Sequence, residues 1–428
     1  MRTSSVACNP LGRISQARSE NKLLAFLRGL SFAALLVATT PALPAAEAPY
    51  PHAAEPIGTV RQIYDGVLTP EMAVNTFRNI DRLFPVRKVP RSSQPAPLPQ
   101  AATPLKTLRF SDEGKQYSLD DYLKLNRVTG LLVLHEGRIK MERYLHGNSE
   151  RTRWMSMSIA KSITSTLIGA AVEEGKITSI TDLVTRYVPA LKDSAYEGVS
   201  VRDVLMMSSG ARWTETYTNP ASDRRRLLEA QIAQKPGGAL AVMKSLPRAA
   251  PPGSVNNYNT GETQVAAEIL RSATGKPLAD YLHERIWNRI DAEADADWWL
   301  ESPDGIEIGG SGFSATLRDY GRFGLFLLNQ GRIGNTAILP AGWVSEATTP
   351  RQLRNGKLLD YGYLWWTGTS PAARKDNSFS AEGIHGQYLY INPATRVVIV
   401  VWSAQPIPLG GAVVNDWAFF DAASEALR

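Results

Sequence analysis

Hydrophobic and polar positions divide the chain into strand-like segments near its two ends and helical segments between them. Residues 130–135 and 138–144 flank Glu136-Gly137, a two-residue turn typical of a β-hairpin. Residues 387–391 and 397–402 are further β segments, joined by a short Asn-Pro-Ala-Thr connection. We expect these segments, distant in sequence, to form one mostly antiparallel sheet.

Helical periodicity dominates the remaining apolar positions. From residue 211 to residue 289 helical patterns follow one another, broken by Pro-Gly and Pro-Pro-Gly sequences. Further helical patterns cover residues 69–85, 118–123, 154–174, 317–329 and 414–427. The fold class is therefore α/β (α+β): a sheet from the two chain ends, flanked by helices, with a mainly helical lobe inserted at about residues 176–310.

The first 46 residues are typical of a bacterial export signal. Basic residues precede an uncharged apolar run, residues 29–40, and small residues follow, with a cleavage point expected after Ala42 or Ala45. The run is too short to remain as a spanning helix, so we expect a periplasmic or secreted protein with no stable membrane span after processing. An N-terminal helix and an extended, proline-rich linker without periodicity (residues 47–105) then precede one domain, residues 106–428.

Charge and cysteine content narrow the possible functions. The leader contributes +4 of the net charge of +6, so the rest of the chain is close to neutral and nucleic-acid binding has little support. The only cysteine, Cys8, lies in the leader, which leaves the processed chain without a disulfide or a thiolate metal site. No metal-ligand cluster or phosphate-binding loop appears, so we expect no cofactor; the oligomeric state is left open.

The helix at residues 154–174 carries the first candidate chemistry. Ser156 and Ser158 are both suitable N-cap residues, and Ser158 and Lys161 lie one turn apart on the same helical face. A buried lysine, its charge disfavoured, can act as a base on a serine hydroxyl. The structural alternative is that Ser158 only caps the helix. The S-x-x-K pattern alone is weak, because it also occurs at Ser19–Lys22 in the leader.

Three aromatic residues are candidates for the same site. Tyr258 lies in a polar loop before an apolar helix, where it is either a surface residue or a proton relay beside a lysine. The relay requires that the cation lower the pKa of the phenol from about 10. The pair Trp365-Trp366 belongs either to the core or to the wall of a substrate pocket.

Taken together, three motifs resemble those of the serine β-lactamase and penicillin-binding-protein superfamily, on its class C side. They are Ser158-Ile159-Ala160-Lys161, Tyr258-Asn259-Thr260, and the sequence Ala-Glu-Gly-Ile-His-Gly-Gln at residues 381–387. The chain is most similar to the 6-aminohexanoate-dimer hydrolase branch and related esterases and amidases, from about Ile57 to the C-terminus. This resemblance implies that Ser158 is the nucleophile, Lys161 its base and Tyr258 the proton relay.

The resemblance also implies how a substrate is held. It places the oxyanion hole at the backbone N–H groups of Ser158 and Ile384. It implies that Tyr217 hydrogen-bonds the substrate amide and that Gly383 keeps the backbone open. His385 is expected either to line the substrate site or to be a structural hydrogen-bonding residue.

Two motifs depart from the β-lactamase pattern. Thr260 replaces the asparagine of the Y-x-N motif, and Ala381 and Glu382 stand where the K-T-G strand has lysine and threonine. The cation that helps to bind the β-lactam carboxylate is therefore missing, and an acid lies nearby. We expect poor binding of penicillins.

The sequence thus predicts an exported serine hydrolase that cleaves amide or ester bonds of small molecules through an acyl-enzyme on Ser158, without metal or cofactor. The alternatives are a β-lactamase or D-Ala-D-Ala carboxypeptidase and, from another class, a non-catalytic binding protein of the same fold. The expected partner is a small-molecule amide or ester, and the sequence does not decide between them.

Overall fold

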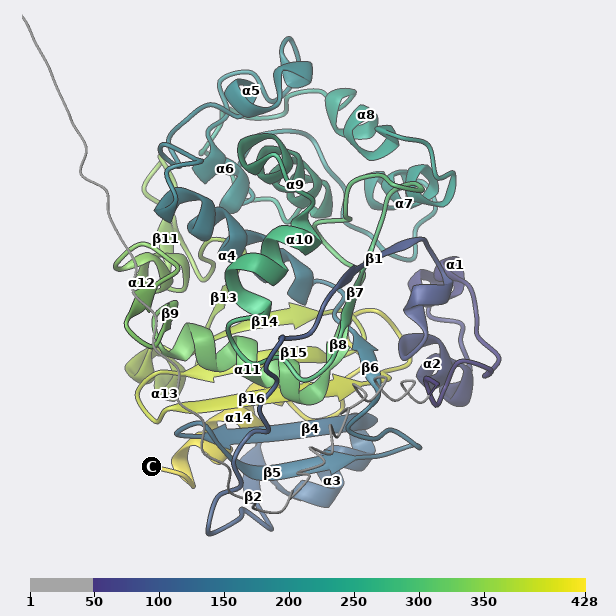
Figure 1. Cartoon of the computed structure of the whole chain (residues 1–428), viewed down its shortest axis with the longest axis vertical. Coiled ribbons are helices and arrows are strands. Elements are labelled where there is room, and N and C mark those ends of the chain that lie inside the picture. Colours follow the sequence, from purple (N-terminus) through teal and green to yellow (C-terminus); the bar gives the residue numbers. More distant parts are fainter. Residues whose placement is uncertain (1–48) are drawn as a thin grey trace, which may run out of the picture. The chain divides into compact units, whose positions relative to one another are not determined.

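The computed structural model describes residues 49–428 (Figure 1). The predicted signal peptide, residues 1–46, and Cys8 lie outside the described residues. Within the described part of the chain, no helix is both long and apolar enough to cross a membrane.

The central element is a six-stranded antiparallel sheet with the strand order β13-β14-β15-β16-β4-β5 (Figure 1). Its strands are β4 (Val128–His135), β5 (Arg138–Tyr144), β13 (Trp366–Thr367), β14 (Phe379–Gly383), β15 (Gln387–Asn392) and β16 (Val397–Ser403). The predicted hairpin is β4 and β5, and β16 pairs with β4 to join the two ends of the chain. The expectation of one sheet built from distant segments is confirmed.

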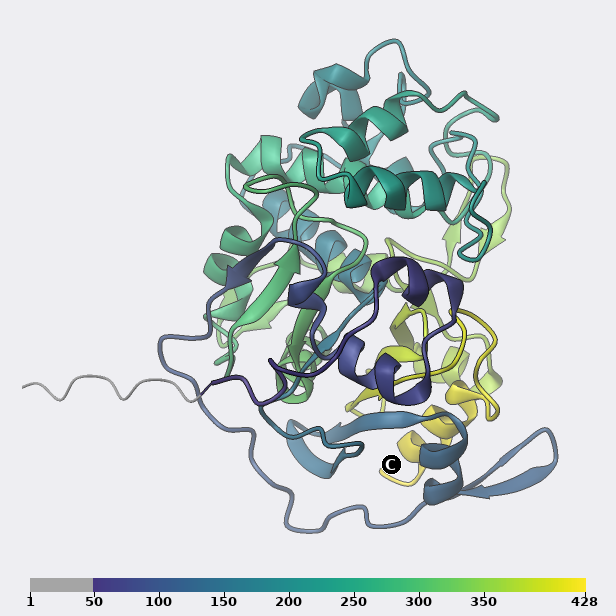
Figure 2. The same ribbon diagram turned by 90° about the vertical axis from the view of Figure 1, so that its right-hand side faces the viewer.

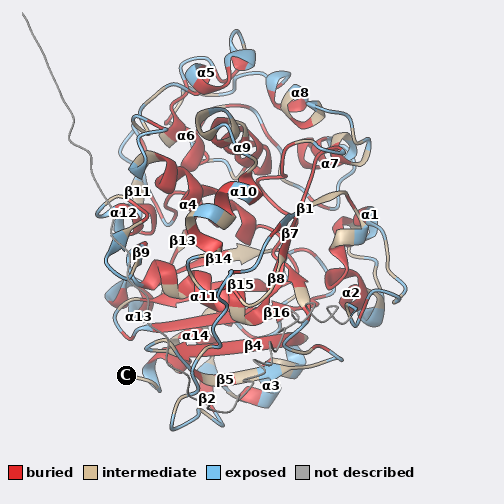
Figure 3. Cartoon of the chain, in the orientation of Figure 1, coloured by how far each residue is buried: buried red, intermediate tan, exposed pale blue. Residues whose placement is uncertain are grey.

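Both faces of this sheet are covered by helices, which is why β4 and β16 are nearly continuous apolar runs. Alternate residues of β4 belong to two separate hydrophobic clusters, with Leu132 in one and Leu131 in the other. Helix α11 (Leu317–Leu328) covers the first face, and α3 (Leu119–Leu125) and α14 (Asp416–Glu425) pack against the second. Figure 3 shows the resulting band of buried residues along β4, β16 and α11.

The predicted helical lobe is present and packs around α4 (Figure 1). Helix α9 contacts α4, α6 and α8, so the buried face of the lobe rests on the helix that begins at Ser158. Helix α4 (Ile159–Glu173) precedes the lobe, whose elements are α5 (Val184–Tyr187), α6 (Val201–Leu205), α7 (Asp223–Ile232), α8 (Gly238–Lys244), α9 (Thr260–Thr274), α10 (Leu278–Leu282) and a π-helical turn, η3 (His283–Trp287).

A second sheet was not predicted. Its strand order is β1-β7-β8-β6, and its strands are β1 (Val86–Val89), β6 (Arg153–Met155), β7 (Ala296–Trp299) and β8 (Phe313–Thr316). The proline-rich segment, expected to be an extended linker, includes β1, which pairs with β7. Strand β1 is at the edge of this sheet and only one of its four residues is buried, so it shows no strong apolar pattern.

The helix predicted over residues 69–85 is also shorter than expected. Helix α2 (Pro70–Phe77) ends at Arg78, and a 3₁₀ turn, η1 (Ile80–Arg82), follows. The side chain of Asn79 donates a hydrogen bond to the carbonyl oxygen of Asn75 (2.9 Å), which accompanies the break. The remaining elements are α1 (Val60–Asp65), η2 (Pro189–Leu191), α12 (Trp343–Ala347), α13 (Pro371–Asp376), β2 (Arg109–Asp112), β3 (Lys115–Ser118), β9 (Arg332–Ile333), β10 (Thr336–Ala337), β11 (Arg351–Gln352) and β12 (Leu358–Leu359).

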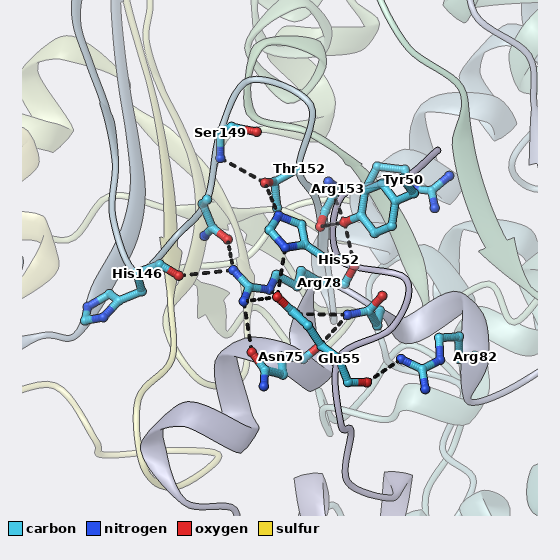
Figure 4. Close-up of polar contacts among 12 residues, drawn as sticks. Tyr50, His52, Glu55, Asn75, Arg78, Arg82, His146, Ser149, Thr152 and Arg153 are labelled. Carbon is cyan, nitrogen blue, oxygen red and sulfur yellow. Dashed lines mark hydrogen bonds and ion pairs between the residues drawn. The ribbon is translucent and has the colours of Figure 1, made fainter. Parts of the chain in front are cut away.

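The segment that carries α1 and α2 is held to the domain by a buried polar network (Figure 4). The Arg78 guanidinium donates to both carboxylate oxygens of Glu55 (2.6 and 2.7 Å) and to the carbonyl oxygen of His146 (3.1 Å). The ring of His52 lies within hydrogen-bond distance of the Thr152 hydroxyl (3.1 Å). Figure 2 shows these purple helices against the side of the domain, beside the yellow C-terminal elements.

Candidate active site

Ser158 is positioned by the turn between β6 and α4. It occupies the N-cap position, but its hydroxyl makes no capping hydrogen bond, and its backbone already has helical angles. The N–H of Ser156 donates to the carbonyl oxygen of Phe313 on β8 (2.7 Å), which fixes the approach to the turn. Met157 adopts a positive φ of 41°, a conformation that is uncommon outside glycine. Because it makes no capping hydrogen bond, the Ser158 hydroxyl is free to interact with other groups.

Lys161 lies directly beneath this hydroxyl. Its Nζ donates hydrogen bonds to Ser158 Oγ (2.8 Å) and to the carbonyl oxygen of Gly310 (2.8 Å). Burial lowers the pKa of Lys161 to about 7, although the carboxylate of Glu215 acts in the opposite direction. A large fraction of this amine is therefore neutral near pH 7 and able to accept a proton.

Tyr258 completes the group from the loop before α9. Its ring lies over Lys161, with Nζ 5.4 Å from the ring centroid, and stacks on Trp366. The lowering of its pKa that the sequence interpretation required is not found. Burial and the nearby Glu215 carboxylate raise the pKa of Tyr258, and the interaction with the Ser158 hydroxyl offsets only part of this. The phenol is therefore protonated and can act as a proton donor.

The end of β14 brings its backbone close to the serine turn. A Cβ atom on Gly383 would lie 2.5 Å from the carbonyl oxygen of Ser156, so only glycine fits without displacement. Ile384 follows at the same cavity wall. Among the turn and loop hydrogen bonds of the described chain, none uses the N–H of Ser158 or Ile384. Both groups remain available to a substrate oxygen.

A cavity of about 360 Å³ joins these parts. Five of the predicted site residues line it: Ser158, Tyr217, Tyr258, Gly383 and Ile384. Lys161 lies below its floor and is 2% exposed.

His385 does not line this cavity. Its two ring nitrogens lie 2.8 Å from the carbonyl oxygen of Gln405 and 3.0 Å from that of Ile63, and burial lowers its pKa. The ring thus links the β14–β15 turn to α1, which corresponds to the structural alternative for this residue.

The structure adds cavity residues that sequence reasoning did not assign. Glu215 accepts hydrogen bonds from the Trp213 indole (2.5 Å) and from the backbone N–H (3.0 Å) and hydroxyl of Thr260. Thr260, which replaces the asparagine of the Y-x-N motif, therefore holds the Glu215 carboxylate in the site. The sequence feature that could have identified Glu215 is its position two residues before Tyr217, which was itself a predicted site residue. Trp366 lines the cavity while Trp365 is in the core, so each alternative for the pair holds for one residue.

The two residues of β14 that depart from the K-T-G pattern face opposite sides of the strand. Ala381 is 1% exposed and belongs to the core, whereas Glu382, one position on, faces the cavity. No lysine or arginine is among the residues that line the cavity. Within residues 49–428, no group of three or more histidine, cysteine, aspartate or glutamate side chains is placed to hold a metal ion.

Known proteins resemble this chain in both sequence and fold. A 6-aminohexanoate-dimer hydrolase from Paenarthrobacter ureafaciens is 28% identical over 347 residues, 78% of this chain and 85% of that protein. A solved structure from Bacillus anthracis assigned as a 6-aminohexanoate-dimer hydrolase superposes with a TM-score of 0.73 at 26% identity, covering 82% of this chain and 92% of that one.

A family VIII carboxylesterase shares the fold at a TM-score of 0.53 and 17% identity, over 70% of this chain and 91% of its own. The Beta-lactamase family profile matches residues 126–424, which include the serine turn, the Tyr258 loop and β14. The chain is a serine hydrolase, and it belongs to the Beta-lactamase family.

Proposed function

We propose that this protein cleaves amide or ester bonds of small molecules through an acyl-enzyme on Ser158, as an amidase or esterase related to the 6-aminohexanoate-dimer hydrolases. The observation that carries the proposal is the buried Lys161 amine, 2.8 Å from Ser158 Oγ and with its pKa lowered to about 7. A serine that only capped the helix would not need a base beneath it.

Acylation begins with the neutral Lys161 amine. It accepts the proton of the Ser158 hydroxyl, and Oγ attacks the substrate carbonyl carbon. The resulting oxyanion accepts hydrogen bonds from the N–H groups of Ser158 and Ile384, each typically worth about 2.7–4 kcal/mol. The Tyr258 phenol donates its proton to the departing amine or alcohol and regains one from the Lys161 ammonium. Water then attacks the acyl-enzyme with the same groups in reversed roles.

The cavity favours a substrate other than a β-lactam. Ala381 replaces the K-T-G lysine, and no other basic side chain lines the cavity to hold a carboxylate. β-Lactamase and D-Ala-D-Ala carboxypeptidase activity are therefore the less favoured alternatives. A non-catalytic binding role is disfavoured because it would not require Ser158, Lys161 and Tyr258 together.

We further propose that the leader directs export and is removed, so that the enzyme works outside the cytoplasm. The support is the sequence pattern of residues 1–46. N-terminal sequencing of the protein recovered from a periplasmic or culture fraction tests this. A chain that begins at Met1 in that fraction would contradict it.

The proposal of a serine nucleophile is tested with a fluorophosphonate probe on the purified protein. We expect stoichiometric labelling of the wild type and none of Ser158→Ala. Ser93→Ala, which removes an exposed serine hydroxyl elsewhere, is the matched control and should be labelled like the wild type. Equal labelling of Ser158→Ala would overturn the assignment.

A further inference from the structure

The carboxylate of Glu382 has one satisfied oxygen and one free oxygen. Oε1 accepts hydrogen bonds from the Ser380 hydroxyl (2.7 Å) and from the Trp417 indole N–H (3.1 Å). Oε2 accepts none from the described residues, and it is not among the enclosed polar atoms that lack a partner. Since Glu382 lines the cavity, Oε2 is accessible to a molecule bound there.

Two different elements hold this carboxylate in place. Ser380 precedes it by two positions on β14 and so shares its face of the strand, while Trp417 comes from α14. Tyr388 of β15 is its direct cross-strand neighbour and also lines the cavity. The orientation of the free oxygen is therefore fixed before any ligand arrives.

The surroundings of the free oxygen suit a positive charge. Glu382 forms no ion pair with another described residue, and burial raises the pKa of its carboxyl group. The rings of Tyr258, Trp366 and Tyr388 line the same cavity, and aromatic faces attract cations. A bound cation would supply the counter-ion that the protein does not provide, which favours its binding.

We propose that Glu382, with the aromatic rings around it, forms a subsite for a cationic group of the substrate, so that the enzyme prefers ammonium-bearing amides or esters to neutral ones. This inference rests on the proposed function and specifies its substrate class. The competing interpretation is that Glu382 is only a structural acceptor for Ser380 and Trp417. Glutamine would serve that role equally well, because its side-chain oxygen also accepts hydrogen bonds.

The test uses two pairs of esters that differ only in charge. The first pair carries the charge on the alcohol: butyrylcholine and 3,3-dimethylbutyl butyrate. The second carries it on the acyl group: the p-nitrophenyl esters of 4-(trimethylammonio)butanoate and 5,5-dimethylhexanoate. The quaternary ammonium keeps its charge at every pH. The readout is the ratio of kcat/KM for the charged to the neutral member, measured within each variant.

In the wild type we expect a ratio of about ten or more in at least one pair, from the attraction of the ammonium to the carboxylate and the aromatic faces. Glu382→Gln should bring that ratio to about one, and Glu382→Asp, which keeps the charge, should retain part of it. Glu173→Gln removes an exposed carboxylate at the other end of α4 and should leave the ratio at the wild-type value.

A ratio that is the same in the wild type and Glu382→Gln for both pairs would overturn the cationic subsite. No turnover of any of the four esters, the neutral members included, would instead count against the proposed hydrolase. The two failures are therefore distinguishable.

Discussion

The two walls of the cavity differ in how closely they follow the family pattern. The serine wall has the full set: Ser158 at the head of α4, Lys161 2.8 Å from its hydroxyl, and Tyr258 over the lysine. The β14 wall retains the glycine that lets the backbone approach but has Ala381 and Glu382 in place of the lysine and threonine. Under the proposed function, the serine wall supplies the nucleophile, base and proton donor, and the side chains of the β14 wall select the substrate.

This difference has a physical basis. Proton transfer and attack at a carbonyl demand fixed distances between a base, a nucleophile and an acid, whatever the rest of the substrate contains. Side chains that contact remote parts of the substrate affect its selection without altering that arrangement. The β14 wall combines both kinds of role, because its backbone faces the proposed oxyanion while the side chain of Glu382 faces the remainder of the cavity.

The largest expected effect is on the serine wall. Lys161→Ala removes the proposed base and should lower kcat/KM for p-nitrophenyl butyrate by about 10³-fold. Lys176→Ala, which changes an exposed lysine just beyond the far end of α4, is the matched control and should remain near the wild type. A loss smaller than about tenfold in folded Lys161→Ala would show that another group activates the serine.

The second-largest effect is expected from a change to the backbone at the end of β14. Gly383→Ala places a methyl group 2.5 Å from the carbonyl oxygen of Ser156, so the strand end must move away from the serine turn. Displacing the N–H of Ile384 should reduce kcat by about 10²-fold, since that is the usual cost of one lost oxyanion donor. Steady-state kinetics check this, with circular dichroism to confirm folding. Unchanged kcat would exclude this strand end from the oxyanion hole.

The fall in kcat/KM at low pH should depend on the protonation of Lys161, in the serine wall, and not on the β14 wall. Because burial lowers the pKa of Lys161 to about 7, the lysine is protonated below that pH and cannot accept the serine proton. We expect kcat/KM for a neutral ester to fall about tenfold per pH unit below the pKa of this group and to level off above it. Glu215 raises this pKa, so Glu215→Gln should move the limb to lower pH. Movement to higher pH would contradict this electrostatic role.

Sequence reasoning succeeded where local pattern and chemistry coincide. The β4–β5 hairpin, α11 and the β15–β16 pair all had strong periodicity, and the structure has each of them. It failed at β1, whose partner β7 is about 200 residues away and of whose four residues only one is buried, so that the strand has no apolar pattern. Such a pairing is determined by tertiary contacts rather than by local propensity.

The same distinction applies to the site. The spacing of Ser158 and Lys161 fixed their proximity, because both lie on one helical face. No local rule gave the direction of the Glu382 side chain, which depends on Trp417 from α14. The pKa of Tyr258 also depends on its environment, since burial and Glu215 raise it by more than the interaction with the Ser158 hydroxyl lowers it.

The smallest expected effect concerns His385, which lies next to the β14 wall but outside the cavity. Asparagine tolerates the positive φ of 64° at this position but cannot reach both carbonyl oxygens that the ring contacts. His385→Asn should therefore lower the free energy of unfolding by about 1–3 kcal/mol, measured by urea denaturation. Because the ring does not line the cavity, KM for a neutral ester should change by less than about twofold. A tenfold rise in KM with unchanged stability would place His385 in the substrate site, and the part of the β14 wall that contacts the substrate would then extend beyond Glu382.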